Sequence, residues 1–342
     1  MAQRFSILGA ELIRRGGAFE LLTTGSLASE FNLPQSPLIR TIDDTELRTP
    51  LTSWLMLAAV FLRVSLGAYR RVHLAGAGRA ATALFWACRV SGTPVSCTFA
   101  SRTLEMASYG RGKDKTRWVQ LLNRVDRIDV LNPGHNLVEW REKIFVSPCS
   151  FPSRMETLPQ VFAQARDRLV VFCGAMEAVK NPFLALDIVD VYISTTGDRI
   201  SILFFGDGPL KPGMKERIDA FNARHGDSRA SFGKSDQLGE VLARANVFLS
   251  LQEADNYPSQ ALLEAMLMGC KFIATDEGDT HLMLPPTESR NSLVNSRSPY
   301  AFLHAMRVAF EDTVASHINA DFARDTHSLA RFAEYFTRFV HD

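Results

Sequence analysis

Short apolar runs rich in Val, Ile and Phe alternate with longer amphipathic stretches along the whole chain. Such runs are typical of buried parallel strands, and the stretches between them have helical spacing. This alternation predicts βαβ units and therefore an α/β protein with parallel sheets. The predicted strands are Phe5–Leu8, Arg71–Leu74, Pro94–Thr98, Arg127–Leu131, Ile144–Val146, Leu169–Cys173, Ile200–Phe205, Ala230–Phe232, Val247–Leu251 and Lys271–Ala274.

A change of composition at Ser147–Ala165 divides the pattern in two. Prolines and small polar residues follow the last strand of the first half, and a new βα unit starts at Leu169. The 342 residues suffice for two domains, since one domain takes about 150 residues. We predict a Rossmann-like N-terminal domain over 1–165, a C-terminal domain over 166–322, and a C-terminal helix over 323–342 that is free to pack back on the first domain.

Charge is distributed unevenly although the formal net charge is only +1. Up to residue 165 there are 20 Lys and Arg residues against 13 Asp and Glu residues, and beyond it 18 against 24. The halves therefore carry roughly +7 and −6 charges. The overall balance argues against a nucleic-acid partner, and the asymmetry predicts different partners for the two halves.

The apolar segment Leu51–Tyr69 is nearly long enough to span a bilayer. Arg63 lies in the middle of it, and an arginine there is costly in hydrocarbon. We therefore predict a helix packed on a sheet, with peripheral contact to an anionic membrane through the basic half.

Five cysteines are scattered without CxxC pairs, which argues against a disulfide framework and against a zinc site. The N-terminal residues do not have the pattern of a signal peptide. We expect a reducing, cytoplasmic location, with any membrane contact at the inner face.

Three stretches of the second half carry candidate chemistry. In the first, Gly174 follows a buried strand and Lys180 precedes a helix, so a positive charge is expected at the carboxyl edge of the sheet, where open α/β sheets bind ligands. In the second, Gly206 and Gly208 form a tight turn after the next strand. Either feature alone is also compatible with an ordinary loop.

The third stretch, LQEADNYPSQALLEAMLMG, predicts a helix that begins near Ser259 and is stopped by Gly269. The backbone N–H groups at its start form a ready diphosphate site. Glu264 lies inside this helix among apolar residues, and its two oxygens suit a ribose diol. The alternative for Glu264 is a structural ion pair.

In order and spacing these stretches resemble the retaining GT-B glycosyltransferases of family 4, mainly over residues 169–280. The resemblance implies two Rossmann-like domains with parallel sheets facing each other across a cleft. It also implies that Lys180 binds donor phosphate and that Glu264 holds the donor ribose. The donor-binding residues expected on these grounds are Gly16, Gly17, Gly174, Lys180, Gly206, Gly208, Phe232, Gly233, Tyr257, Ser259, Gln260, Ala261 and Glu264.

The sequence departs from the family pattern at several positions. The first glutamate of the paired motif is replaced by Asn256, with Asp255 one residue earlier, and we take these two as the candidate catalytic residues. Ala175 stands where an arginine is usual. A histidine usual in the first half is missing, with Arg102 the nearest polar candidate, and His73 is interpreted as structural.

The implied reaction is transfer of a hexose-type sugar from a UDP- or GDP-linked donor to a glycan or lipid-linked acceptor, with retention, in polysaccharide, O-antigen or lipid-linked glycan assembly. No cofactor and no metal are expected, because Lys180 and the helix N-terminus would stabilise the leaving diphosphate. Two alternatives are a non-catalytic sugar-nucleotide-binding homologue and a sugar-nucleotide epimerase of the same fold.

Overall fold

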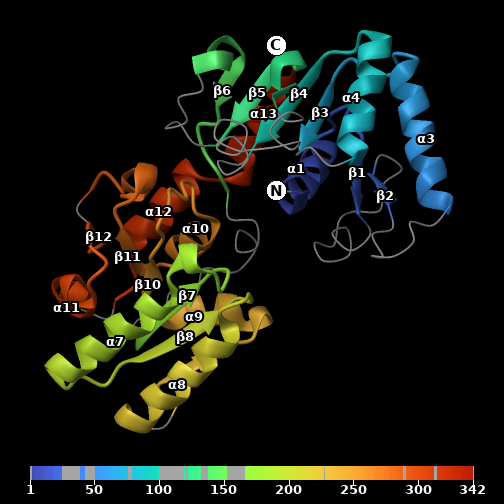
Figure 1. Ribbon diagram of the computed structural model, residues 1–342. Coiled ribbons are helices and arrows are strands. Elements are labelled where there is room, and N and C mark those ends of the chain that lie inside the picture. Colours follow the sequence, from blue (N-terminus) through green and yellow to red (C-terminus); the bar gives the residue numbers. More distant parts are fainter. Residues whose placement is uncertain are drawn as a thin grey trace. The chain divides into compact units, whose positions relative to one another are not determined.

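A computed structural model describes residues 2–24, 39–42, 51–75, 79–99, 119–120, 122–131, 138–151, 166–226, 228–287, 290–311 and 314–341. The chain forms two compact units (Figure 1). The first comprises Met1–Cys149 together with Leu329–Asp342, and the second comprises Ser150–Ser328. Both contain parallel sheets, which confirms the predicted α/β class.

The first unit has a four-stranded parallel sheet in the order β3-β4-β5-β6 and a separate parallel pair, β1-β2. The strands are β1 (Leu21–Thr24), β2 (Ile39–Ile42), β3 (Val72–Ala75), β4 (Val95–Phe99), β5 (Arg127–Val130) and β6 (Ile144–Val146). The helices are α1 (Ala2–Arg14), α3 (Leu51–Ser65), α4 (Arg79–Ser91), the 3₁₀ segment η1 (Val138–Lys143) and α13 (Leu329–His341). Among the described residues, no helix is both long and apolar enough to cross a bilayer.

The prediction of a strand at Phe5–Leu8 is wrong, because these residues lie inside α1. Phe5, Leu8 and Leu12 are all buried, and their spacing of three and four residues places them on one face of a helix. Gly16 follows the helix with a φ of 78° and donates its N–H to Ile13 O at 2.9 Å. The glycine pair at Gly16 therefore ends a helix instead of following a strand.

Partly buried hydrogen bonds attach α13 to the first sheet. Tyr335 Oη donates to Asp129 Oδ1 at 2.7 Å, and Arg127 Nη1 donates to the carbonyl of Phe339 at 2.9 Å. Burial and the Asp129 carboxylate raise the pKa of Tyr335. His73 bonds Ser96 Oγ and Thr98 Oγ1 at 3.0 Å through its two ring nitrogens, and burial lowers its pKa to about 3. His73 is thus a neutral, structural histidine, as its sequence context predicted.

The second unit is a six-stranded parallel sheet in the order β12-β11-β10-β7-β8-β9. Its strands are β7 (Asp167–Cys173), β8 (Ser201–Phe205), β9 (Ala230–Phe232), β10 (Ala245–Ser250), β11 (Lys271–Thr275) and β12 (Ser292–Val294). Its α-helices are α7 (Pro182–Thr196), α8 (Lys211–His225), α9 (Leu238–Arg244), α10 (Gln260–Leu267), α11 (Leu303–Phe310) and α12 (His317–Thr326). The 3₁₀ segments are η2 (Ala178–Lys180), η3 (Ser235–Gln237), η4 (Gly278–Met283) and η5 (Pro299–Phe302).

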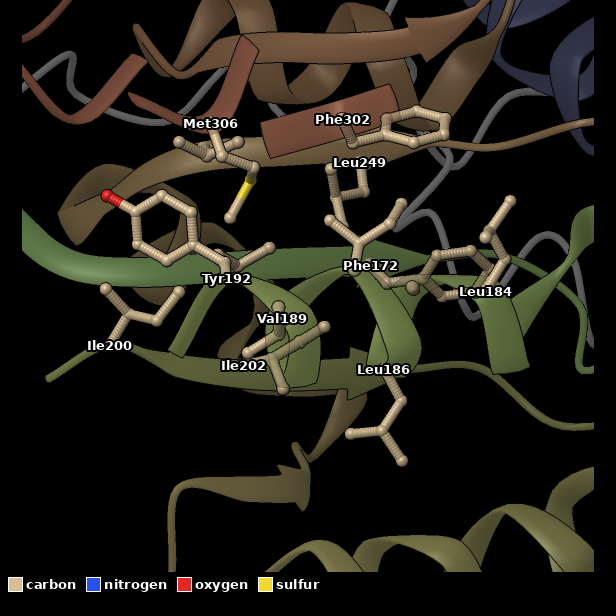
Figure 2. Close-up of a cluster of buried hydrophobic side chains, with 14 of the residues drawn as sticks. Phe172, Leu184, Leu186, Val189, Tyr192, Ile200, Ile202, Leu249, Phe302 and Met306 are labelled. Carbon is tan, nitrogen blue, oxygen red and sulfur yellow. The ribbon is translucent and has the colours of Figure 1, made fainter. Parts of the chain in front are cut away.

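Both faces of this sheet are covered by apolar cores. Along β7, Val170 and Phe172 join one cluster and Leu169 and Val171 join the other, as the alternation of side chains in a strand requires. Figure 2 shows part of the first cluster, in which α7 residues such as Tyr192 meet strand residues of β7, β8 and β10. Strands buried on both faces have continuous apolar sequences, which is why β7, β10 and β11 were predicted to within two residues at each end. The strand β12, which is only partly buried, was not predicted.

The strand order contains one point at which the chain reverses the direction in which it adds strands to the sheet. The chain builds β7, β8 and β9 outward on one side, then returns to place β10 beside β7 and continues to β11 and β12. The reversal therefore lies between the carboxyl ends of β7 and β10. In open α/β sheets this is where ligands bind.

Candidate functional site

Lys180 reaches across the point of reversal. It ends η2, the short turn after β7. Its Nζ donates to Gln252 Oε1 at 2.6 Å and to Asn256 Oδ1 at 2.9 Å, both in the loop after β10. The N–H of Glu253 also donates to the carbonyl of Val179 at 2.9 Å. The structure thus brings together Lys180 and Asn256, two residues that the sequence singled out separately.

The loops after β7 and β8 are joined through their backbones. Gly174 N donates to Phe205 O at 3.0 Å, and Met176 N donates to Asp207 O at 2.9 Å. A Cβ on Gly206 would lie 1.9 Å from the Gly174 carbonyl oxygen, and one on Gly208 would lie 2.7 Å from the Met176 oxygen. These glycines are required because two loop backbones touch.

The predicted helix near Ser259 is confirmed as α10. Ser259 is its N-cap, with Oγ accepting the Leu262 N–H at 3.4 Å. The N–H groups of the first turn, including those of Gln260 and Ala261, have no carbonyl to bond within the helix and point toward its N-terminal end. The Gln260 side chain donates to Ser150 Oγ at 2.7 Å. The backbone N–H of Gln260 is therefore more available to a ligand than its side-chain amide.

Glu264 lies in α10 with only 6% of its surface exposed, and a carboxylate this buried normally has polar partners. Leu263 and Ala265 on either side of it are completely buried. A carboxylate in such surroundings must have a structural or a binding role.

Asp255 joins two loops at the same sheet edge. Its Oδ1 accepts the N–H of Tyr257 at 3.0 Å and that of Asp279, in the loop after β11, at 3.3 Å. Gly278 makes room for this contact, since a Cβ there would lie 2.4 Å from Asp255 Cβ. Asp255 and Asn256 are therefore neighbours with different partners, and a catalytic role for either stays a prediction.

The remaining expected donor residues of this unit, Phe232 and Gly233, lie at the end of β9. A Cβ on Gly233 would lie 2.3 Å from the Phe205 ring, so a side chain there would have to displace this buried ring. Lys211 Nζ lies 5.4 Å from the centre of the Phe232 ring, and this cation–π contact places a further positive charge beside the strand end.

Gly16 and Gly17 lie in the first unit, just after α1. Gly16 and Gly17 both donate N–H groups to the last turn of α1, at 2.9 and 3.0 Å, and their role toward a donor stays a prediction. Arg14 and Arg15 both pair with Glu11. Arg102 lies outside the described residues.

Gln252 is the functional candidate that sequence reasoning missed. It lies two residues beyond the end of β10, and its amide bonds Lys180 directly. Its position just past a predicted strand, in the same loop as Asp255 and Asn256, was the signal that could have identified it.

Residues 167–312 match the family described as glycosyl transferases group 1. No curated protein matches the chain.

Solved structures similar to the whole chain include a glycosyltransferase from Rickettsia africae, with 13% identity, a TM-score of 0.69, and coverage of 99% of this chain and 93% of that one. Anabaena HepE in complex with UDP-glucose has 15% identity, a TM-score of 0.69 and coverage of 99% and 95%. Sucrose-phosphate synthase from Thermosynechococcus elongatus has 16% identity, a TM-score of 0.67 and coverage of 97% and 90%. The fold is therefore GT-B.

Substitution of Gly206 tests the close approach of the loops after β7 and β8. Gly206→Ala should lower the free energy of unfolding by about 2 to 4 kcal/mol, through overpacking and the unfavourable backbone conformation. Gly197→Ala is the matched control, because Gly197 also has a positive φ, 71°, but nothing within 4 Å of a new Cβ. It should cost about 1 kcal/mol. Equal losses for the two variants in urea denaturation would contradict the close approach.

Proposed function

We propose that this protein is a glycosyltransferase that transfers a sugar from a nucleotide diphosphate sugar to an acceptor hydroxyl. The observation that carries the proposal is the position of Lys180, held between the loops after β7 and β10 where the sheet reverses direction. The family match over residues 167–312 supports it. So do the similar structures of Anabaena HepE in complex with UDP and glucose and with UDP-glucose.

Lys180 and the first turn of α10 supply the positive potential that a diphosphate needs. A leaving diphosphate gains negative charge as the sugar bond breaks, so groups that stabilise this charge accelerate the reaction. The lysine provides a full charge and the helix N-terminus a partial one. On this basis we propose chemistry that needs no divalent metal. Resemblance of the Lys180, glycine-turn and Glu264 motifs to retaining enzymes supports retention at the anomeric carbon.

Replacement of Lys180 tests the diphosphate assignment. Lys180→Met keeps most of the side-chain stem but removes the ammonium. It should weaken binding of UDP or GDP about tenfold or more and lower turnover of the nucleotide sugar. Lys215→Met, at an exposed position of α8, should change neither.

Calorimetric titration measures the affinity, and release of UDP or GDP from the sugar nucleotide measures turnover. If Lys180→Met turned over the nucleotide sugar as fast as the wild-type protein, the assignment of Lys180 to the donor diphosphate would be wrong. Loss of wild-type turnover in EDTA would contradict the metal-independent mechanism. Binding by the wild-type protein without any turnover would favour the non-catalytic alternative.

Glu264 is proposed to accept hydrogen bonds from the donor ribose. Glu264→Gln keeps the shape but replaces an ionised acceptor with an amide, and charge-assisted bonds are roughly twice as strong as neutral ones. Nucleotide affinity should fall by about 1.5 to 3 kcal/mol, roughly ten- to a hundredfold. The Tm of the free protein should stay nearly constant.

Calorimetry and thermal unfolding of the same variant decide the role of Glu264. Glu216→Gln, at an exposed position of α8, is the matched control. A lowered Tm with unchanged nucleotide affinity would show that Glu264 is a structural residue.

We also propose that the first unit binds an anionic membrane, where a lipid-linked acceptor would be presented. The exposed face of α3 is apolar at its C-terminal end: Leu62 is 58% exposed and Phe61 is exposed beside it, and Leu66, one residue beyond the helix, is 75% exposed. Helices with an apolar outer face on a basic unit suit the surface of an anionic bilayer.

Vesicle binding tests this surface. The protein should sediment with vesicles containing anionic phospholipid, less so at high salt, because exposed charges are screened. The double variant Leu62→Ser, Leu66→Ser should bind several-fold less, whereas Tyr300→Ser, at an exposed site of the second unit, should bind like wild type. Equal sedimentation with neutral and anionic vesicles, or with neither, would contradict the proposal.

A further inference from the structure

Gln252 is bound at both ends of its side-chain amide. Lysine only donates hydrogen bonds, so the amide oxygen must face Lys180 Nζ, 2.6 Å away. The amide nitrogen then faces the other way and donates to Ser250 Oγ at 3.1 Å. The orientation of the amide is thereby set by its two neighbours.

The backbone of Gln252 is fixed as well. Thr275 Oγ1, at the end of β11, donates to the Gln252 carbonyl at 2.7 Å. Thr275 is 3% exposed and Ser250 is 6% exposed, so both anchors are themselves held by the core. Gln252 thus connects the buried ends of β10 and β11 to a lysine on the other side of the sheet reversal.

A lysine side chain needs hydrogen-bond partners of this kind if its ammonium group is to stay in one position. Its four-carbon stem carries about 2 kcal/mol of rotamer entropy. Two acceptors, Gln252 and Asn256, restrict Nζ before any ligand arrives, and the first of them is itself anchored. Both are neutral amides, which orient the ammonium without supplying the full negative charge that would compete with a bound anion.

We infer that Gln252 is a positioning residue that holds the Lys180 ammonium in place for the donor diphosphate. This inference rests on the proposed function. Gln252→Leu, which has similar size but no acceptor, should weaken UDP or GDP binding about tenfold, through the less ordered lysine. Gln252→Glu should also weaken binding, because its carboxylate pairs with the ammonium, while its Tm should not fall.

A double-mutant cycle separates positioning from a general structural effect. In the Lys180→Met background, Gln252→Leu should cause no further loss of nucleotide affinity, because it acts through the lysine. Gln120→Leu, at an exposed position of the first unit, is the matched control and should bind nucleotide like wild type. Calorimetric titration with UDP and GDP, with Tm measured for every variant, provides the readout.

The outcomes distinguish the two proposals. If the wild-type protein binds neither UDP nor GDP, the proposed function fails and this inference fails with it. If the wild type binds but Gln252→Leu binds equally well, or if its effect multiplies with that of Lys180→Met, only the positioning role is overturned. Should Gln252→Leu prove unstable, Gln252→Glu still decides, since unchanged affinity in that variant contradicts the inference.

Discussion

Lys180 and Asn256 lie 76 residues apart in the sequence, and they meet only because β10 returns to pair with β7. Parallel strands joined by helical crossovers place all their carboxyl ends on one edge, and adjacent strands place their following loops side by side. Had β10 been added beyond β9, the loop carrying Asn256 would lie several strands away from Lys180. The strand order is therefore the constraint from which the site follows.

Close contact between loops accounts for the glycines at this edge. Gly206 and Gly208 face the carbonyl groups of Gly174 and Met176, and Gly278 faces Asp255. In each case, the space that a side chain would take is filled by a neighbouring loop. The loops after β7, β8, β10 and β11 thus form one connected layer, which explains how polar groups contributed by separate strands hold fixed positions.

The second unit could be predicted far more completely than the first, for physical reasons. Strands covered on both faces leave continuous apolar runs, and Lys271–Ala274 is found within one residue of its predicted bounds as the fully buried strand β11. Phe5–Leu8 has the same apolar composition but belongs to a helix. Its helical spacing becomes evident only when the buried Leu12 is included. The pairing of Lys180 with Gln252 could not be predicted, because it depends on the strand order and on the path of two loops.

The one-residue difference from the family pattern now has a structural meaning. Position 256, eight residues before Glu264, is the position at which the resemblance implies a glutamate, and there the side chain faces the Lys180 ammonium. A carboxylate at this point would be held against the lysine, and an anionic ligand would have to compete with it. The Asn256 amide accepts the same hydrogen bond without that charge. The acidic residue next to it, Asp255, accepts a hydrogen bond from the backbone of the loop after β11. Asn256 and Asp255 thus bond to different partners, so any contact between Asp255 and a transferred sugar would be made from a carboxylate already held by two backbone N–H groups.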